Sequence, residues 1–236
     1  MTRPKGAISP YLAPGFYDRA LEEGRHRDIV GGRWDETGRL QMRLLTEAGL
    51  RPHHRLLDIG AGALRLGCRA VPYLEPGHYW ATDASHALME RGRQVELADP
   101  ARLPPDRLIG DAEFSLPGVP ADIDFAIAFA VFTHLPAERL DTALRSIRAR
   151  CPSLTALLFT VFLAPDAEAA RGALRQPDGV VTHPARPPYH RLAGDVAASA
   201  QSAGFTLEFR ADRLPRGQVL AFARPANQGG GDARDR

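Results

Sequence analysis

The stretch LLDIGAGALRLG, residues 56–67, decides the fold. A short apolar run ends in the carboxylate of Asp58, and Gly60 and Gly62 follow before a segment whose apolar residues recur at helical spacing. Glycines let a backbone bend sharply and approach a ligand closely, because no β-carbon occupies the space. The pattern therefore indicates a strand-to-helix turn of the kind that binds nucleotides.

Apolar runs and helical patterns alternate along the rest of the chain. Strands are predicted at 55–59, 79–83, 107–110, 123–130, 155–163, 205–211 and 218–223. Helices are predicted at 16–23, in the stretch that ends at Gly49, and at 63–74, 84–98, 136–150 and 193–203. This alternation is typical of a doubly wound, mostly parallel, Rossmann-like α/β sheet, here with seven strands. Only a short LPRG turn region separates the last two strands, which predicts an antiparallel hairpin at the sheet edge.

Length and composition favour one main domain with irregular ends. We divide the chain into an N-terminal arm and helical cap (1–52), the main domain (53–224) and a disordered tail (225–236). The formal charge of +2 on 236 residues is too small for a nucleic-acid partner. No secretory signal or membrane-spanning run is found, and Cys68 and Cys151 lack metal-ligand spacing, so we expect a cytoplasmic protein without a metal or membrane contact. No oligomeric state is predicted.

An acidic residue follows the glycine turn at the distance that a ribose-binding carboxylate requires. Asp83 stands at the end of the second predicted strand, where it can accept hydrogen bonds from both ribose hydroxyls. A helix N-cap is the alternative role. A dinucleotide fingerprint that starts at Gly60 needs a third glycine at position 65, but the chain has Arg65 there. S-adenosylmethionine (SAM) carries no phosphate, so it fits this turn better than a dinucleotide.

Four motifs together resemble one known family. LLDIGAGALRLG, YWATDAS, LIGDAEF and IDFAIAFAVFTHL occur in the order and at the spacing of the class I SAM-dependent methyltransferases, over roughly residues 53–163. The chain departs from many members at Leu64, where they carry a third glycine. The resemblance implies SAM as cofactor and a set of cofactor-binding residues: Asp58, Gly60, Ala61 and Gly62 at the methionine part, Asp83 and Ala84 at the ribose, Asp111, Ala112 and Glu113 at the adenine, and Phe129 and Ala130 beneath the cofactor. For Asp111 a solvated turn carboxylate is the alternative.

Methyl transfer from a sulfonium requires alignment of the reactants and a proton acceptor. His134 follows the fourth predicted strand and is our first candidate for a general base, with His190 as the second. His134 can equally bond the loop backbone, and His190 can lie in a solvated loop. That loop, 176–191, is rich in proline and is a place where substrate-binding segments are inserted. Trp34 and Tyr189 are candidate substrate contacts, with packing as their alternative role.

The sequence does not identify which arginine binds an anionic group, nor which molecule accepts the methyl group. Arg33, Arg39 and Arg65 are each candidates for binding the cofactor carboxylate or an anionic substrate, with a solvated surface position as the alternative. The chain lacks the Asn-Pro-Pro-Tyr type of motif that resembles enzymes methylating amino groups of nucleic-acid bases or glutamine. It also lacks the acidic cluster expected for magnesium-dependent catechol methylation. We therefore expect O- or N-methylation of a small molecule or a modified peptide. A non-catalytic SAM-binding regulatory module and an NAD(P)-dependent oxidoreductase remain as alternatives.

Overall fold

The computed structural model describes Ser9, residues 15–211 and residues 214–226. Of the predicted N-terminal arm and helical cap, residues 1–8 and 10–14 lie outside the described residues, as does the predicted tail from residue 227 onward. The tail was predicted from Pro225, but this residue still belongs to the last strand, and the N–H of Ala226 donates to the carbonyl of Gly204.

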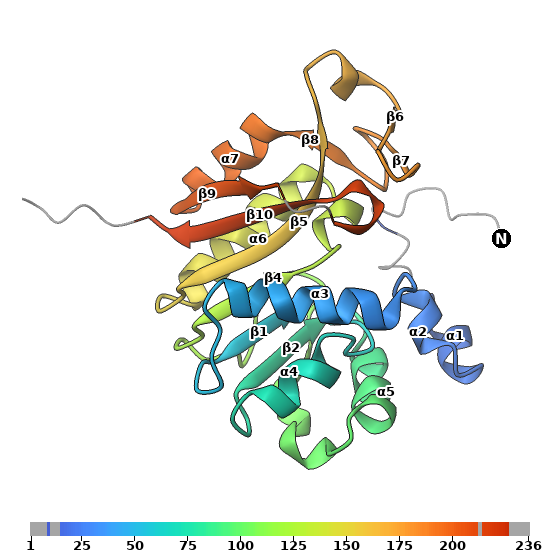
Figure 1. The fold of residues 1–236 in the computed structure, drawn as a ribbon, viewed down its shortest axis with the longest axis vertical. Helices are drawn as coiled ribbons and strands as arrows, with labels where there is room; N and C mark the ends of the chain where they lie inside the picture. Colours follow the sequence, from blue (N-terminus) through green and yellow to red (C-terminus); the bar gives the residue numbers. More distant parts are fainter. Residues whose placement is uncertain (1–8, 10–14, 212–213, 227–236) are drawn as a thin grey trace, which may run out of the picture.

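The strands form one large sheet and a small hairpin (Figure 1). They are β1 (Leu56–Ile59), β2 (Tyr79–Asp83), β3 (Leu108–Gly110), β4 (Phe125–Ala128), β5 (Ala156–Ala164), β6 (Leu174–Arg175), β7 (Val181–Thr182), β8 (His190–Leu192), β9 (Phe205–Arg210) and β10 (Val219–Pro225). The large sheet has the order β3-β2-β1-β4-β5-β10-β9, with β8 paired to β5. Pairing is parallel from β3 through β5, whereas β10 is antiparallel to both β5 and β9. The predicted sheet and its antiparallel edge hairpin are confirmed.

Helices cover both faces of the sheet (Figure 1). Their bounds are α1 (Asp18–Glu22), α2 (His26–Ile29), α3 (Trp34–Glu47), α4 (Gly67–Tyr73), α5 (His86–Glu96), α6 (Ala137–Arg150) and α7 (Ala193–Ser202). In the part of the chain that the structure describes, none of them has the length and apolarity that crossing a membrane requires.

Alternating side chains of the central strands build two separate cores. Leu56 belongs to the core that contains Leu44 of α3 and residues of α4 and α5. Its neighbour Leu57 belongs to the core that contains Leu144 of α6 and residues of α7. Successive strand residues point to opposite faces, so a strand covered on both sides must be apolar almost throughout. This double burial explains the continuous apolar runs of β4 and β5, and it holds the carboxyl ends of the strands in fixed positions.

One predicted helix begins later than its apolar pattern indicates. The pattern starts at 63, but α4 begins only at Gly67. Leu64 has a φ of +62°, in the left-handed region that an α-helix excludes. Its side chain is completely buried. The family that the sequence resembles often has glycine at this position, and Leu64 keeps a backbone conformation that favours glycine while its side chain is buried.

The segment 176–191 is more ordered than the predicted open loop. It contains β7 and the start of β8, and β8 adds to the sheet in parallel with the carboxyl end of β5. The interpretation as a loop is wrong in this part, because backbone pairing with Phe162 and Leu163 fixes His190 and Arg191 in a strand. The segment therefore forms a wall above the carboxyl end of β5.

Candidate functional site

The glycine turn and Asp83 are joined by a direct hydrogen bond. The N–H of Gly62 donates to Oδ2 of Asp83 at 2.9 Å, and the N–H of Ser85 donates to Oδ1 at 2.9 Å. Asp83 is not the N-cap of α5, because the Ser85 side chain has that role. Burial raises the pKa of Asp83, while the N–H groups of Ser85 and Gly62 lower it. Each carboxylate oxygen has a second lone pair, which remains for a ligand hydroxyl.

The two glycines of the turn have no room for side chains. Gly60 has a φ of +68°, and a β-carbon there would lie 2.4 Å from Cγ2 of Val131. Gly62 has a φ of +57°, and its β-carbon would lie 2.8 Å from Cγ1 of Val30. Both the backbone conformation and the neighbouring side chains therefore require glycine.

Asp58 lies behind the turn and is almost fully buried. Its Oδ2 accepts a hydrogen bond from the Tyr79 hydroxyl at 2.6 Å. Burial raises the pKa of Asp58 to about 7, against the opposing effects of the Tyr79 hydrogen bond and the Arg65 charge. Asp58 is therefore partly protonated near pH 7, and a nearby cation would favour its ionised form.

Asp111 organises the loop after β3. Its carboxylate accepts hydrogen bonds from the N–H groups of Glu113 and Leu116 and from the Ser115 hydroxyl. Its own N–H donates to the carbonyl of Asp83 at 2.8 Å, which links this loop to the end of β2. The Glu113 side chain points to Arg139, with which it forms an ion pair. Only Asp111 of the two acids lines the cavity described next.

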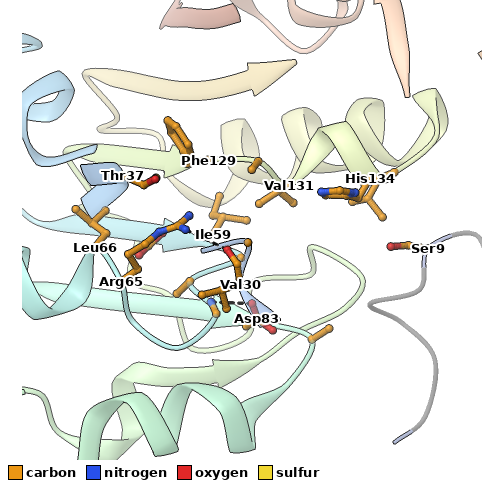
Figure 2. A pocket seen from close by; sticks show the side chains of 18 of the residues that line it. Ser9, Val30, Thr37, Ile59, Arg65, Leu66, Asp83, Phe129, Val131 and His134 are labelled. Carbon is orange, nitrogen blue, oxygen red and sulfur yellow. Dashed lines mark hydrogen bonds between the residues drawn. The ribbon is translucent and has the colours of Figure 1, made fainter. Parts of the chain in front are cut away.

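A cavity lies over the carboxyl ends of β1, β2 and β4 (Figure 2). It brings together most of the predicted cofactor residues and one predicted catalytic residue: Asp58, Gly60, Ala61, Gly62, Asp83, Ala84, Asp111, Ala112, Phe129, Ala130 and His134. Figure 2 shows Thr37, Leu66 and Arg65 toward one end and His134 with Ser9 at the other, with Asp83 between them. Segments from many parts of the chain therefore share one binding volume.

His134 occupies the end of a short 3₁₀ turn, η4 (Phe132–His134), beside the cavity. Burial, and to a smaller extent the charge of Arg216, lowers the pKa of His134 to about 4. Arg191 braces the turn by donating to the carbonyls of Phe132 and Leu135 at 3.0 and 2.7 Å. The imidazole is therefore neutral near pH 7 and is a weak proton acceptor.

Three other predicted site residues lie outside the lining of this cavity. Trp34 packs edge-on against His26 and beneath the guanidinium of Arg27. The Tyr189 side chain is buried, and its N–H donates to the carbonyl of Thr133. His190 is buried, with Nδ1 hydrogen-bonded to the Thr182 hydroxyl and Nε2 to the carbonyl of Ala170. The structure thus places these three side chains in packing and bracing contacts.

The N-terminal segment closes over the turn. Arg65 lines the cavity and donates to the carbonyls of Val30 and Gly32 at 3.0 and 3.2 Å. Farther out, Glu96 of α5 accepts hydrogen bonds from both His26 and Arg27 of α2. These contacts hold residues 26–33 against the glycine turn. Arg33 lines the cavity with an exposed side chain, whereas Arg39 does not line it.

Sequence reasoning missed the polar side chains that α3 contributes. Gln41 and Thr37 line the cavity and are buried. Oε1 of Gln41 and Nε of Arg65 are buried without a hydrogen-bond partner among the described residues. Buried polar atoms normally have partners, so these two indicate a polar ligand. A signal was present: positions 37 and 41 are in helical register with the buried Leu44 and Leu45, where an apolar residue is expected.

Comparisons with known proteins identify solved structures that share this fold. No family model and no curated sequence matches the chain. Among solved structures, magnesium protoporphyrin IX methyltransferase from Synechocystis, with bound SAM, has a TM-score of 0.60 at 13% identity, covering 94% of this chain and 100% of that one. A 1,6-didemethyltoxoflavin-N1-methyltransferase from Burkholderia thailandensis, with its substrate and S-adenosylhomocysteine, has 0.58 at 18%, covering 96% and 94%. Human N-acetylserotonin methyltransferase, with SAM, has 0.61 at 17%, covering 91% and 60%.

These similarities extend over nearly the whole chain, whose sheet is mostly parallel with one antiparallel pair of strands. The chain therefore has the class I SAM-dependent methyltransferase fold.

Proposed function

We propose that this protein is a SAM-dependent methyltransferase that methylates an oxygen or nitrogen atom of a small molecule or a modified peptide. The observation that carries the proposal is the bonded pair of Asp83 and the Gly62 N–H at the carboxyl ends of β1 and β2. It joins the two glycines of the turn, which let the backbone approach a ligand closely, to a carboxylate whose remaining lone pairs can accept hydrogen bonds from ribose hydroxyls. The structural neighbours with SAM or S-adenosylhomocysteine support this choice of cofactor.

The orphaned polar atoms of the cavity fit the amino-acid end of SAM. We assign the cofactor carboxylate to Arg65, because this guanidinium lines the cavity and has an unpartnered buried Nε. We assign the cofactor ammonium to Oε1 of Gln41, which is buried and needs a donor. Arg39 is excluded from this role by its place outside the cavity lining. Residues 15–52 then act as a cap, with residues 26–33 closing the methionine end.

The protein's own contribution to the reaction is alignment. SAM supplies an activated methyl group, so the chain needs no nucleophile of its own. The glycine turn and Asp83 hold one reactant, and the walls formed by β5 and the segment after it hold the other. Because the pKa of His134 is about 4, we assign this neutral imidazole to orienting the acceptor through a hydrogen bond. The acceptor atom then gives up its proton to water, before or during the methyl transfer.

A two-stage measurement tests the proposal. Calorimetric titration with SAM and with NAD first identifies the bound nucleotide, and formation of S-adenosylhomocysteine is then followed with a panel of phenols, amines and carboxylic acids. SAM binding with turnover of at least one acceptor class is the expected result. SAM binding with no turnover across the panel would favour the regulatory module, and NAD binding without SAM binding would favour the oxidoreductase.

A further inference from the structure

The two ends of the cavity differ in charge. Its lining carboxylates, Asp58, Asp83 and Asp111, lie on or directly after β1, β2 and β3, which form one half of the sheet. Among the described residues, no aspartate or glutamate lines the other end, beyond β4. The cavity is therefore acidic only where the ribose and adenine are proposed to bind.

The end beyond β4 combines apolar walls with the guanidinium of Arg216. Phe162 of β5 and the segment residues Val180 and Pro188 provide apolar surface. Arg216, in the connection before β10, brings a guanidinium to the cavity beside Gly31, whose carbonyl accepts a hydrogen bond from it. An apolar molecule with a negative group would satisfy both features, because an uncompensated cation in a partly enclosed site favours an anion.

Arg216 is held in place by its backbone and by one side-chain bond. Its N–H donates to the carboxylate of Asp178 at 2.8 Å, and Nη2 donates to the carbonyl of Gly31 at 2.8 Å. Asp178 does not line this cavity. Within the described residues, no carboxylate forms a salt bridge with the Arg216 guanidinium, whose other N–H groups therefore lack an anionic partner. Its charge contributes, after burial, to the low pKa of His134, so the two groups are close enough to interact electrostatically.

We propose that the methyl acceptor is an apolar small molecule that carries a carboxylate, and that Arg216 binds this carboxylate. The planar guanidinium matches the geometry of a carboxylate, and the bond is charge-assisted. This inference rests on the proposed function, because it assumes that the acidic end of the cavity holds SAM. It makes Arg216 a determinant of acceptor specificity, with His134 close enough to feel its charge.

Matched pairs of acids and amides test the proposal. The probes are para-hydroxybenzoate and its homologues with one and two added methylene groups, each paired with its primary amide. Affinities are measured by calorimetry in the presence of S-adenosylhomocysteine. At least one acid is expected to bind roughly tenfold more tightly than its amide, as for a charge-assisted hydrogen bond. Arg216→Gln should remove this preference, and Arg216→Lys should keep part of it. The control Arg186→Gln, at an exposed position outside the cavity lining, should leave it unchanged.

The ratio of acid to amide affinity separates recognition from a structural role. Loss of the Gly31 contact would weaken both members of a pair equally, so only a change in their ratio reports the charge of Arg216. Equal affinity of acids and amides, a preference that survives Arg216→Gln, or no binding of any acid would overturn the proposal. SAM titration of the same protein distinguishes the two failures: if SAM binds, only the acceptor inference fails, whereas absence of SAM binding contradicts the proposed function itself.

Discussion

The two ends of the cavity are assembled in different ways. The proposed cofactor end is lined mainly by residues 58–62, 65–66, 82–84, 111–112 and 114. Backbone N–H groups bond these segments to one another, near the ends of three neighbouring strands. The acceptor end combines η4, the end of β5, the segment 176–191 and the connection before β10. There, the side chain of Arg216 bonds to Gly31, 185 positions away in the chain. Short motifs therefore encode the first end, whereas the tertiary fold creates the second.

The largest effect is expected at the glycine turn. Gly60→Val combines a left-handed backbone with a clash against Val131 and should reduce SAM affinity by about a thousandfold, from several kcal/mol of strain and overpacking. The matched control is Gly118→Val. Gly118 also has a positive φ, of +74°, but the nearest atom to its β-carbon is 4.0 Å away and it does not line the cavity. Calorimetry should show normal SAM binding by the control. Equal loss in both variants would mean that backbone strain alone is responsible.

His134, at the acceptor end, should make the free energy of unfolding depend on pH in the acid range. The unfolded chain protonates this imidazole near pH 6.5, and the folded chain only near pH 4. The free energy of unfolding should therefore fall by about 3 kcal/mol as the pH decreases between these values. Denaturant unfolding of the wild type and His134→Leu measures this contribution as the difference in their pH slopes. Parallel slopes from pH 7 to pH 4 would show that His134 titrates normally.

A smaller effect is expected from the cation of the cofactor end. Arg65→Gln should weaken SAM binding roughly tenfold, because one charge-assisted hydrogen bond to the cofactor carboxylate is lost. Arg39→Gln is the control on α3, outside the cavity lining. Adenosine, which has no carboxylate, should bind both variants as it binds the wild type. Weaker adenosine binding by Arg65→Gln would assign the residue to holding the N-terminal segment instead.

The smallest expected effect distinguishes a charged from an uncharged sulfur. Burial raises the pKa of Asp58 to about 7, and a bound sulfonium would favour the ionised carboxylate and lower this pKa. SAM affinity should thus rise about threefold between pH 6 and pH 8, by linkage, and the affinity for S-adenosylhomocysteine should rise less. Calorimetry of Asp58→Asn should give the same SAM affinity at both pH values. An increase that persists in this variant would point to another titrating group.

The same contrast between the ends explains what the sequence could predict. The strands were predictable because burial on both faces makes β4 and β5 apolar throughout, and the glycine turn because two glycines must stand next to a strand end. The late start of α4 was not, since its periodicity gives no sign that Leu64 adopts a left-handed conformation. The acceptor end was not predictable either. Arg216 is one arginine among many in the sequence, and only the fold brings it to the cavity.

His190 and Gln41 show two ways in which sequence prediction of the site fails. His190 stands in a proline-rich segment that resembles a substrate loop, but pairing of β8 with β5 buries it. Gln41 stands in a helix that resembles an ordinary packing helix, but its amide reaches the cavity. Residue type and local pattern do not determine which side chain faces a ligand, because that depends on contacts between distant segments.

The central claim is that Asp83, bonded to the glycine turn, binds the ribose of SAM. Calorimetric titration of SAM into the wild type and into Asp83→Asn, with circular dichroism to confirm that the variant is folded, tests it most directly. The account predicts binding by the wild type and at least tenfold weaker binding by the variant, from the loss of charge-assisted hydrogen bonds. Equal affinity of the two folded proteins for SAM would contradict it.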